Sequence, residues 1–308
     1  MATYPTHCLK KNFFDKFQVL TYHIYTIYLF SCNNIIDVIL PGLLFGSFGA
    51  SIASRFSMGG DIMFYEIVRS IPKMLLWSWC NLLFFNLSNQ RGSINEDILN
   101  KPWRPLPSGR LTPSQATAIF HCMYPIVFII SLTIGGLFPS ILIIALSYWY
   151  DDQDGGSDPL QKNIINGLGI GSFFAGPLEV ITRRSILLNG GSRVATWVGI
   201  LMATIATTSH IQDLRDVDGD KAVGRRTLPV AIGDSNARLV AAIGIFSWTW
   251  IACCFWNAGW VEASLAIGAG AVMEGSMLFF RSKVGDVRTW KIFPLWMLGL
   301  FLLPILAP

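Results

Sequence analysis

The chain has 308 residues, of which 52% are hydrophobic and only 14% are charged, and its formal net charge is +4. Soluble domains carry about 25% charged residues, because a polar shell keeps their apolar interior dissolved. This composition excludes a soluble globule, and the same apolar content excludes a disordered chain. It predicts one domain that crosses a membrane several times.

Nine stretches are apolar enough to form membrane helices, for which about 20 residues are needed. They lie near residues 33–54, 66–90, 113–135, 138–150, 162–183, 192–213, 235–256, 259–280 and 288–307, the fourth being short. Their apolar runs show no period-two alternation, which favours helices over the strands of a barrel. The predicted fold class is therefore all-α, a polytopic bundle of about nine transmembrane helices.

Residues 12–31 form a further, aromatic-rich stretch before the first span. We expect it to be an interfacial helix or an extension of that span. The predicted organisation is a cytoplasmic or interfacial segment, 1–32, followed by a transmembrane domain, 33–308. Because the start lacks the pattern of a cleaved signal peptide, the first hydrophobic helices are expected to direct insertion. The lipid bilayer is the expected surrounding, and no nucleic-acid or protein partner is predicted.

The charged residues of the chain are distributed unevenly between the two sides. With a cytoplasmic N-terminus, seventeen Lys and Arg residues fall on the cytoplasmic side and six on the other, as the positive-inside rule favours. Ten of the 19 acidic residues also crowd three cytoplasmic loops. Acids gathered at one face argue against a transporter, whose site lies near the bilayer midplane. We expect a multi-pass protein of the endoplasmic reticulum with these acids facing the cytoplasm.

Three aspartates, Asp213, Asp216 and Asp220, are spaced i, i+3 and i+7 and share one face of a helix end. Stacked carboxylates repel one another unless a cation lies between them. Mg²⁺ takes oxygen ligands and usually bridges carboxylates to phosphates. The spacing therefore favours a magnesium site over a solvated loop with local salt bridges.

A second polar cluster lies between residues 86 and 110. Asn89, Ser93 and Asp97 follow one another at four-residue intervals, with Glu96 beside Asp97. Three prolines then break the helix. Cations follow in the same segment, and they are Lys101, Arg104 and Arg110. Oxygen ligands next to Lys and Arg suit Mg²⁺ with a diphosphate, whereas the alternative is a structured cytoplasmic turn.

Together the two clusters resemble the signatures of the UbiA superfamily of intramembrane prenyltransferases. The family pattern reads roughly NDxxDxxxD, then a Lys/Arg-Pro-x-Arg-Pro turn, and later DxxDxxxD. Here the second motif is intact, and the turn stands as Lys101-Pro102-Trp103-Arg104-Pro105. In the first motif Asn89 and Asp97 match, but Gln90 and Ser93 stand where the family usually has aspartate. The resemblance covers nearly the whole chain.

The resemblance implies a helical bundle around a central, lipid-accessible cavity, capped by two acidic motifs that bind Mg²⁺ and the diphosphate of an isoprenoid. The residues that we predict to hold the metal are Asn89, Glu96, Asp97, Asp213, Asp216 and Asp220, of which the four aspartates are also predicted to be catalytic. Those assigned to the diphosphate are Lys101, Arg104, Arg225 and Arg226. The expected substrate-pocket residues are Gln90, Ser93, Tyr148, Tyr150, Asn166 and His210.

The departure at Gln90 and Ser93 bears on the reaction. Two missing carboxylates remove a candidate base for deprotonating a phenolic acceptor. The pattern NQxxSxxED followed by NKPWRP is similar to fungal members of the superfamily, which include membrane-bound terpene cyclases. We therefore expect Mg²⁺-dependent ionisation of farnesyl or geranylgeranyl diphosphate and its cyclisation to a terpene hydrocarbon. The alternative is prenyl transfer to an aromatic or other acceptor. The Lys that often follows the family's Tyr is absent, and Asp151 and Asp152 stand there instead.

Overall fold

The computed structural model describes residues 6–188, 192–222 and 224–308, and within these ranges it contains helices and turns but no strand. The α-helices are α1 (Thr6–Ser31), α2 (Leu40–Ser51), α3 (Phe64–Gly92), α4 (Ile94–Asn100), α5 (Pro113–Ile134), α6 (Leu137–Ser147), α7 (Pro159–Thr182), α8 (Ser192–Thr208), α9 (Val217–Ala222), α10 (Leu228–Ile232), α11 (Asp234–Trp256), α12 (Ser264–Phe279) and α13 (Lys283–Leu306). Short π and 3₁₀ segments connect them, and these are η1 (Ile35–Ile39), η2 (Tyr148–Asp152), η3 (Gly155–Ser157) and η4 (Ser209–Asp216). The predicted all-α fold class is confirmed.

Each apolar stretch of the sequence coincides with a helix, but the helices differ in how well they could span a bilayer. Over the described ranges, five are long and apolar enough by length and composition, and they are α5, α7, α8 with its continuation to Lys221, α11 and α13. A sixth arises if the bent pair α1–α2 counts as one span. The others fall short because α6 and α12 are shorter, and because α3 carries charged and polar side chains along its length.

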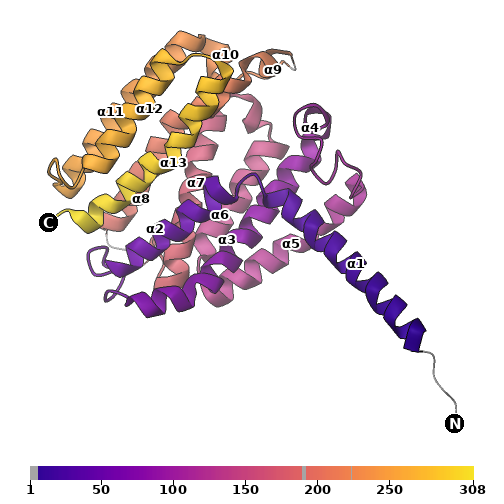
Figure 1. The fold of residues 1–308 in the computed structure, drawn as a ribbon. Coiled ribbons are helices and arrows are strands. Elements are labelled where there is room, and N and C mark those ends of the chain that lie inside the picture. Colours follow the sequence, from indigo (N-terminus) through magenta and orange to yellow (C-terminus); the bar gives the residue numbers. More distant parts are fainter. Residues whose placement is uncertain (1–5, 189–191, 223) are drawn as a thin grey trace.

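Helix α7 lies at the centre of the bundle and is the most buried of the five spans, packing against α2, α3, α6 and α8. The last three helices, α11 to α13, lie side by side on one flank (Figure 1). The rings of Phe45, Phe174 and Phe301 contact one another at centroid distances of 5.0–5.8 Å. Because they come from α2, α7 and α13, this cluster joins the first and last parts of the chain.

Helix α1 extends away from the bundle (Figure 1) and carries many exposed aromatic and aliphatic side chains. Its axis over Phe17–Ser31 is bent by 60° from that of Ile35–Ser51. The Arg110 guanidinium lies over the rings of Tyr22 and Tyr25, at 4.7 and 4.8 Å. The two segments therefore do not form one straight helix.

Glycines let α7 and α8 approach closely. A methyl group added at Gly167 would meet the Met202 carbonyl oxygen at 2.5 Å and the Ala206 Cβ at 2.6 Å, whereas one added at Gly169 would meet nothing within 4 Å. Small residues commonly allow such backbone contact in membrane helices. The seam between the two helices is therefore set by Gly167 and not by its neighbour two residues later.

This seam gives a matched pair of variants. Gly167→Ala should lower stability by about 1–3 kcal/mol, the usual cost of overpacking a core, because backbone atoms of α8 would have to move. Gly169→Ala lies on the same helix in open space and should be neutral or slightly stabilising. Thermal unfolding of both purified proteins in detergent measures the difference, and equal midpoints would contradict the assigned seam.

Candidate functional site

The two acidic clusters meet at one end of the bundle, where α4 and α9 lie near each other (Figure 1). Arg225, just after α9, donates from Nη1 to Glu96 Oε1 at 3.0 Å and from Nη2 to the Tyr150 hydroxyl at 3.1 Å. One guanidinium therefore joins the first acidic cluster, the η2 turn and the loop after the second cluster. These two hydrogen bonds join residues that are 129 and 75 positions apart in the sequence.

The second motif does not continue the α-helix that precedes it. Helix α8 ends at Thr208, and Asp213 and Asp216 lie on the 3₁₀ segment η4, whereas Asp220 lies on α9. The hydroxyls of Thr207 and Thr208 donate to carbonyls four residues earlier, at 2.8 and 2.6 Å, and such bonds bend helices. In a 3₁₀ helix, residues three apart lie above one another, yet Asp213 is buried whereas Asp216 is exposed.

Asp213 is buried and bound to a lysine that sequence reasoning did not assign to the site. Lys162 Nζ donates to Asp213 Oδ1 at 2.7 Å, and both side chains are at most 8% exposed. Asp213 Oδ2 is buried and lacks a hydrogen-bond partner in the described part of the chain. Asp220 accepts a bond from the Thr227 hydroxyl at 3.0 Å, whereas Asp216 is exposed. A lysine in the first turn of a predicted span was the signal that could have identified Lys162.

In the first cluster, Asp97 and Arg104 bind each other. Arg104 Nη1 donates to both carboxylate oxygens of Asp97 at 2.8 Å, and the two residues are 6% and 2% exposed. The Ser93 hydroxyl donates to the Asn89 carbonyl at 3.1 Å and is 3.3 Å from Asp97 Oδ2. Arg104 therefore neutralises a carboxylate of the predicted metal set in this structure.

Lys101 lies within electrostatic reach of both clusters. Burial, together with the nearby Arg104 charge, lowers the pKa of Lys101 below its ordinary value, and the carboxylates of Asp97, Glu96 and Asp216 act in the opposite direction. A lysine at this position is suited to bind an anion that lies between the two acidic clusters. Arg226, also predicted to bind the diphosphate, is exposed.

Asp151 is the second residue that sequence reasoning left out of the site. Its carboxylate accepts from the Ser88 hydroxyl at 2.6 Å and from the Asn89 side-chain amide at 3.2 Å. Burial raises the pKa of Asp151 to about 6, against the lowering effect of these two bonds. The absence of the family's usual Lys at this point of the chain could have drawn attention to Asp151. The contact of Asp151 with α3, however, depends on tertiary structure.

The predicted pocket residues separate into two groups. Tyr150 lies at the site through its bond to Arg225, and the half-buried Asn166 lies one turn after Lys162 on α7. Tyr148 is 54% exposed, and its hydroxyl accepts from Gln153 at 2.8 Å. It therefore lies on the outside of the η2 turn.

Gln90 and His210 are both fully buried and bonded to neighbouring helices. Gln90 Nε2 donates to the Phe30 carbonyl of α1 at 3.2 Å, so this end of the side chain is turned toward α1. His210 Nε2 lies 2.9 Å from the Ala237 carbonyl of α11 and donates to it, because a carbonyl only accepts. These contacts favour a structural role for both side chains.

The donors near the two clusters fit Mg²⁺ by their chemistry. Within the described residues, His, Cys, Asp and Glu side chains form no group of three arranged around a metal. The available ligands are carboxylate oxygens and the Asn89 amide, which are the hard donors that Mg²⁺ prefers. Asp213 Oδ2, buried and unpartnered, is one such donor. Metal binding would require the carboxylates now paired with Lys162 and Arg104 to share or exchange these cations.

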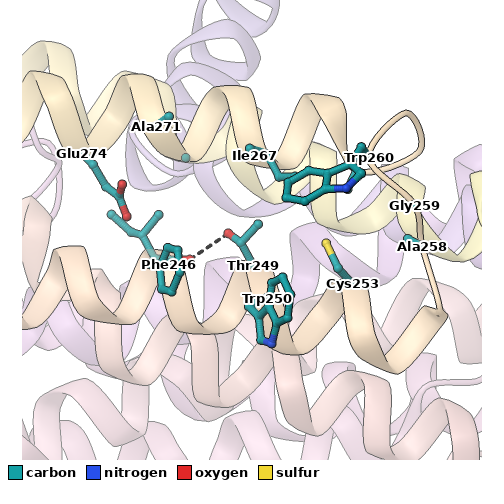
Figure 2. Close-up of a pocket in the computed structure, with 13 residues that line it drawn as sticks. Phe246, Thr249, Trp250, Cys253, Ala258, Gly259, Trp260, Ile267, Ala271 and Glu274 are labelled. Atoms are coloured by element: carbon teal, nitrogen blue, oxygen red, sulfur yellow. Dashed lines mark hydrogen bonds between the residues drawn. The ribbon is translucent and has the colours of Figure 1, made fainter.

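A groove of about 410 Å³ lies elsewhere, between α11 and α12 (Figure 2). Its lining is aromatic and aliphatic, includes Phe246, Trp250 and Trp260, and has the Glu274 carboxyl at one end. Thr249 in this groove is roughly 18 Å along α11 from Ala237, the partner of His210, at 1.5 Å per residue. The groove is therefore separate from the acidic clusters.

Comparison with known proteins identifies related chains and folds. Residues 43–300 match the profile of the UbiA prenyltransferase family. The chain is 27% identical over 284 residues to the fumagillin beta-trans-bergamotene synthase of Aspergillus fumigatus, covering 91% of each chain. It is 28% identical over 258 residues to a polyprenyl transferase of Hericium erinaceus, covering 83% of this chain and 84% of the relative.

The fold is similar to that of a UbiA homologue from Archaeoglobus fulgidus, whose structure was solved with bound GPP and Mg²⁺. The TM-score is 0.61 at 14% sequence identity, and the match covers 91% of this chain and 99% of the homologue. At this identity, the likeness concerns the fold. The nearly complete coverage indicates that the helical bundle as a whole is shared.

The Asp97–Arg104 pair generates a stability prediction. Arg104→Gln should cost about 3–5 kcal/mol, because removing one partner leaves a buried carboxylate uncompensated. The matched control is Arg226→Gln, which removes the same charge from an exposed position. Thermal unfolding in detergent, at neutral pH, measures both; equal effects of the two variants would contradict a buried pair.

Proposed function

Because this chain belongs to the UbiA prenyltransferase family of membrane enzymes, we propose that it ionises an isoprenoid diphosphate and cyclises the hydrocarbon chain without an acceptor. The substrate is farnesyl or geranylgeranyl diphosphate and the product is a terpene hydrocarbon. The observation that carries this proposal is the state of the first motif, where two positions usually occupied by aspartate hold neutral side chains bonded within the protein.

Those two positions are Gln90, which donates to the Phe30 carbonyl, and Ser93, which donates to the Asn89 carbonyl. Neither supplies a carboxylate that could take a proton from an acceptor hydroxyl. The relation to a bergamotene synthase over 91% of both chains supports the same conclusion. A reaction without an acceptor needs no such base at the moment when carbon–carbon bonds form.

The acidic residues are proposed to hold the metal. Mg²⁺, when bound, would offset the charge of the diphosphate as the allylic C–O bond breaks. The residues that would hold it are Asn89, Glu96, Asp97, Asp213, Asp216 and Asp220. A homologue of this fold binds GPP together with Mg²⁺, which supports this choice of ion and of substrate class.

Cationic side chains are proposed to hold the leaving diphosphate. Lys162 and Lys101 lie among the carboxylates of the two clusters, and Arg225 lies between them. We assign Arg104 and Arg226 to the same anion, with Arg104 sharing its charge with Asp97. When the C–O bond breaks, its electron pair leaves with the diphosphate. A double bond of the same chain then attacks the carbocation, and loss of a proton to the released diphosphate gives the neutral hydrocarbon.

We further propose nine spans with a cytoplasmic N-terminus, in the endoplasmic reticulum, with both acidic motifs facing the cytoplasm. Each predicted span overlaps a helix, and five or six helices of the described ranges are long and apolar enough to cross a membrane, which supports several spans. The excess of Lys and Arg on one side supports the orientation. In this arrangement the diphosphate is drawn from the cytoplasmic side, and the isoprenoid tail enters the apolar interior.

Prenyl transfer to an acceptor is the second candidate, and the relation to a polyprenyl transferase of Hericium erinaceus favours it. The two reactions share the ionisation step and differ in what captures the carbocation. They are therefore separated by whether isoprenoid diphosphate alone is converted to a hydrocarbon.

The test uses membranes containing the full chain, Mg²⁺ and either farnesyl or geranylgeranyl diphosphate, with no acceptor added. We expect a cyclic hydrocarbon in the organic extract by gas chromatography with mass detection, and none in the presence of EDTA. Consumption of the diphosphate only after an acceptor is supplied, with the prenyl group found on that acceptor, would replace cyclisation by transfer.

A substitution at the second motif tests the assignment of the metal residues. Asp213→Asn preserves the size of the side chain but removes its charge, and we expect turnover to fall by about 100-fold or more, as for loss of a single electrostatic contact in a transition state. The matched control is Asp218→Asn, at an exposed aspartate of the same segment. Similar turnover by both variants would remove Asp213 from the mechanism.

A further inference from the structure

The first motif retains Asn89 as a predicted metal ligand, and the environment of this amide is unusual. Its Nδ2 donates to Asp151 Oδ1 at 3.2 Å, so a carboxylate from a distant turn lies against it. A carboxylate only accepts hydrogen bonds. The amide must therefore direct its nitrogen toward Asp151, and the planar geometry of the group directs its oxygen away from that carboxylate.

The carboxylate of Asp151 is itself held from the other side. The Ser88 hydroxyl donates to its Oδ2 at 2.6 Å, and Ser88 is almost completely buried on α3. Two consecutive residues of α3 thus bind the two oxygens of one carboxylate. This arrangement fixes the carboxylate and the Asn89 amide relative to each other.

The turn that carries Asp151 is braced by its neighbours. Methyl groups added at Gly155 and Gly156 would meet Trp149 at 2.8 Å and the ring of Tyr150 at 2.7 Å, so the chain folds tightly back on the η2 turn. The Tyr150 hydroxyl is bound to Arg225 at 3.1 Å. Asp151 is therefore presented by a packed turn with support on both sides.

We propose that Asp151 is a positioning residue for the first motif: it directs the Asn89 amide oxygen toward the metal. This inference rests on the proposed function, in which Asn89 is a metal ligand. Residues that orient a metal ligand in this way typically contribute 10–100-fold to metal affinity.

The test measures Mn²⁺ binding to the full chain in detergent, by the electron paramagnetic resonance signal of free Mn²⁺, with inorganic pyrophosphate present. Asp151→Asn should weaken binding by about 10-fold or more, because an amide at position 151 can accept or donate and no longer fixes Asn89. Asp152→Asn removes the same charge from the exposed neighbouring residue and should leave binding unchanged.

A reciprocal double variant separates orientation from a merely structural role. Asn89→Asp combined with Asp151→Asn keeps a donor–acceptor pair between the two residues and again presents an oxygen from position 89. We expect it to restore Mn²⁺ affinity to within about threefold of the wild type, because the second substitution gives position 151 a matching partner again. If gel filtration shows that Asp151→Asn alone does not fold, the double variant still tests the proposal.

The outcomes are distinct. Unchanged binding by Asp151→Asn, or a double variant no better than the single one, would overturn the positioning role and leave the proposed function intact. Failure of the wild type to bind Mn²⁺ with pyrophosphate would overturn both. Weakened binding that the double variant restores would establish that the Asn89–Asp151 pair acts on the metal.

Discussion

Removing a charge from water costs several kcal/mol unless a charge of opposite sign lies beside it. The bundle buries several charges near the end where its acidic motifs lie, and the described structure pairs them across helices. Lys162 of α7 binds Asp213 of η4, and Arg225 binds Glu96 of α4. On the flank, the Arg238 guanidinium of α11 binds Asp286 of α13 with both side chains at most 3% exposed. These ion pairs therefore join separate segments of the bundle, and they also limit what their side chains can do.

The same constraint explains why the proposed chemistry is compatible with a stable bundle. Carboxylates that bind a metal ion and a diphosphate must not destabilise the bundle when neither ligand is present. In this structure Asp213 and Asp97 are neutralised by Lys162 and Arg104, which are also the cations proposed to meet the diphosphate. An arriving anion and its metal would thus exchange partners within one group of charges. Such exchange avoids exposing an uncompensated charge to the apolar interior at any stage.

Much of the fold was predictable from the sequence, because most of the long helices are apolar runs without the alternation of strands. The spacing of Asp213, Asp216 and Asp220 predicted a shared face, but in the structure Asp213 and Asp220 are buried whereas Asp216 is exposed. The spacing also did not predict the change to a 3₁₀ segment after α8. Spacing along one helix also says nothing about contacts between helices. For this reason Lys162 and Asp151 were missed.

Gln90 illustrates the same limit from the other direction. Its place in a motif predicted a side chain facing the substrate, yet its amide reaches the Phe30 carbonyl, because α1 packs there against α3. Nothing in the motif itself specifies that neighbour. The sequence motifs thus located the two polar segments, whereas tertiary packing determined which of their side chains face one another.

The attachment of α1 to the rest of the molecule extends the influence of the N-terminal segment. Through the Phe30 carbonyl it supports Gln90, and through Tyr22 and Tyr25 it supports Arg110, so both ends of the first polar cluster rest on a helix that contains none of the motif residues. Shortening the chain at residue 32 would accordingly change the supports of the cluster rather than remove an inert leader. A sequence change in α1 would then alter the surroundings of the first polar cluster while every motif residue stays the same.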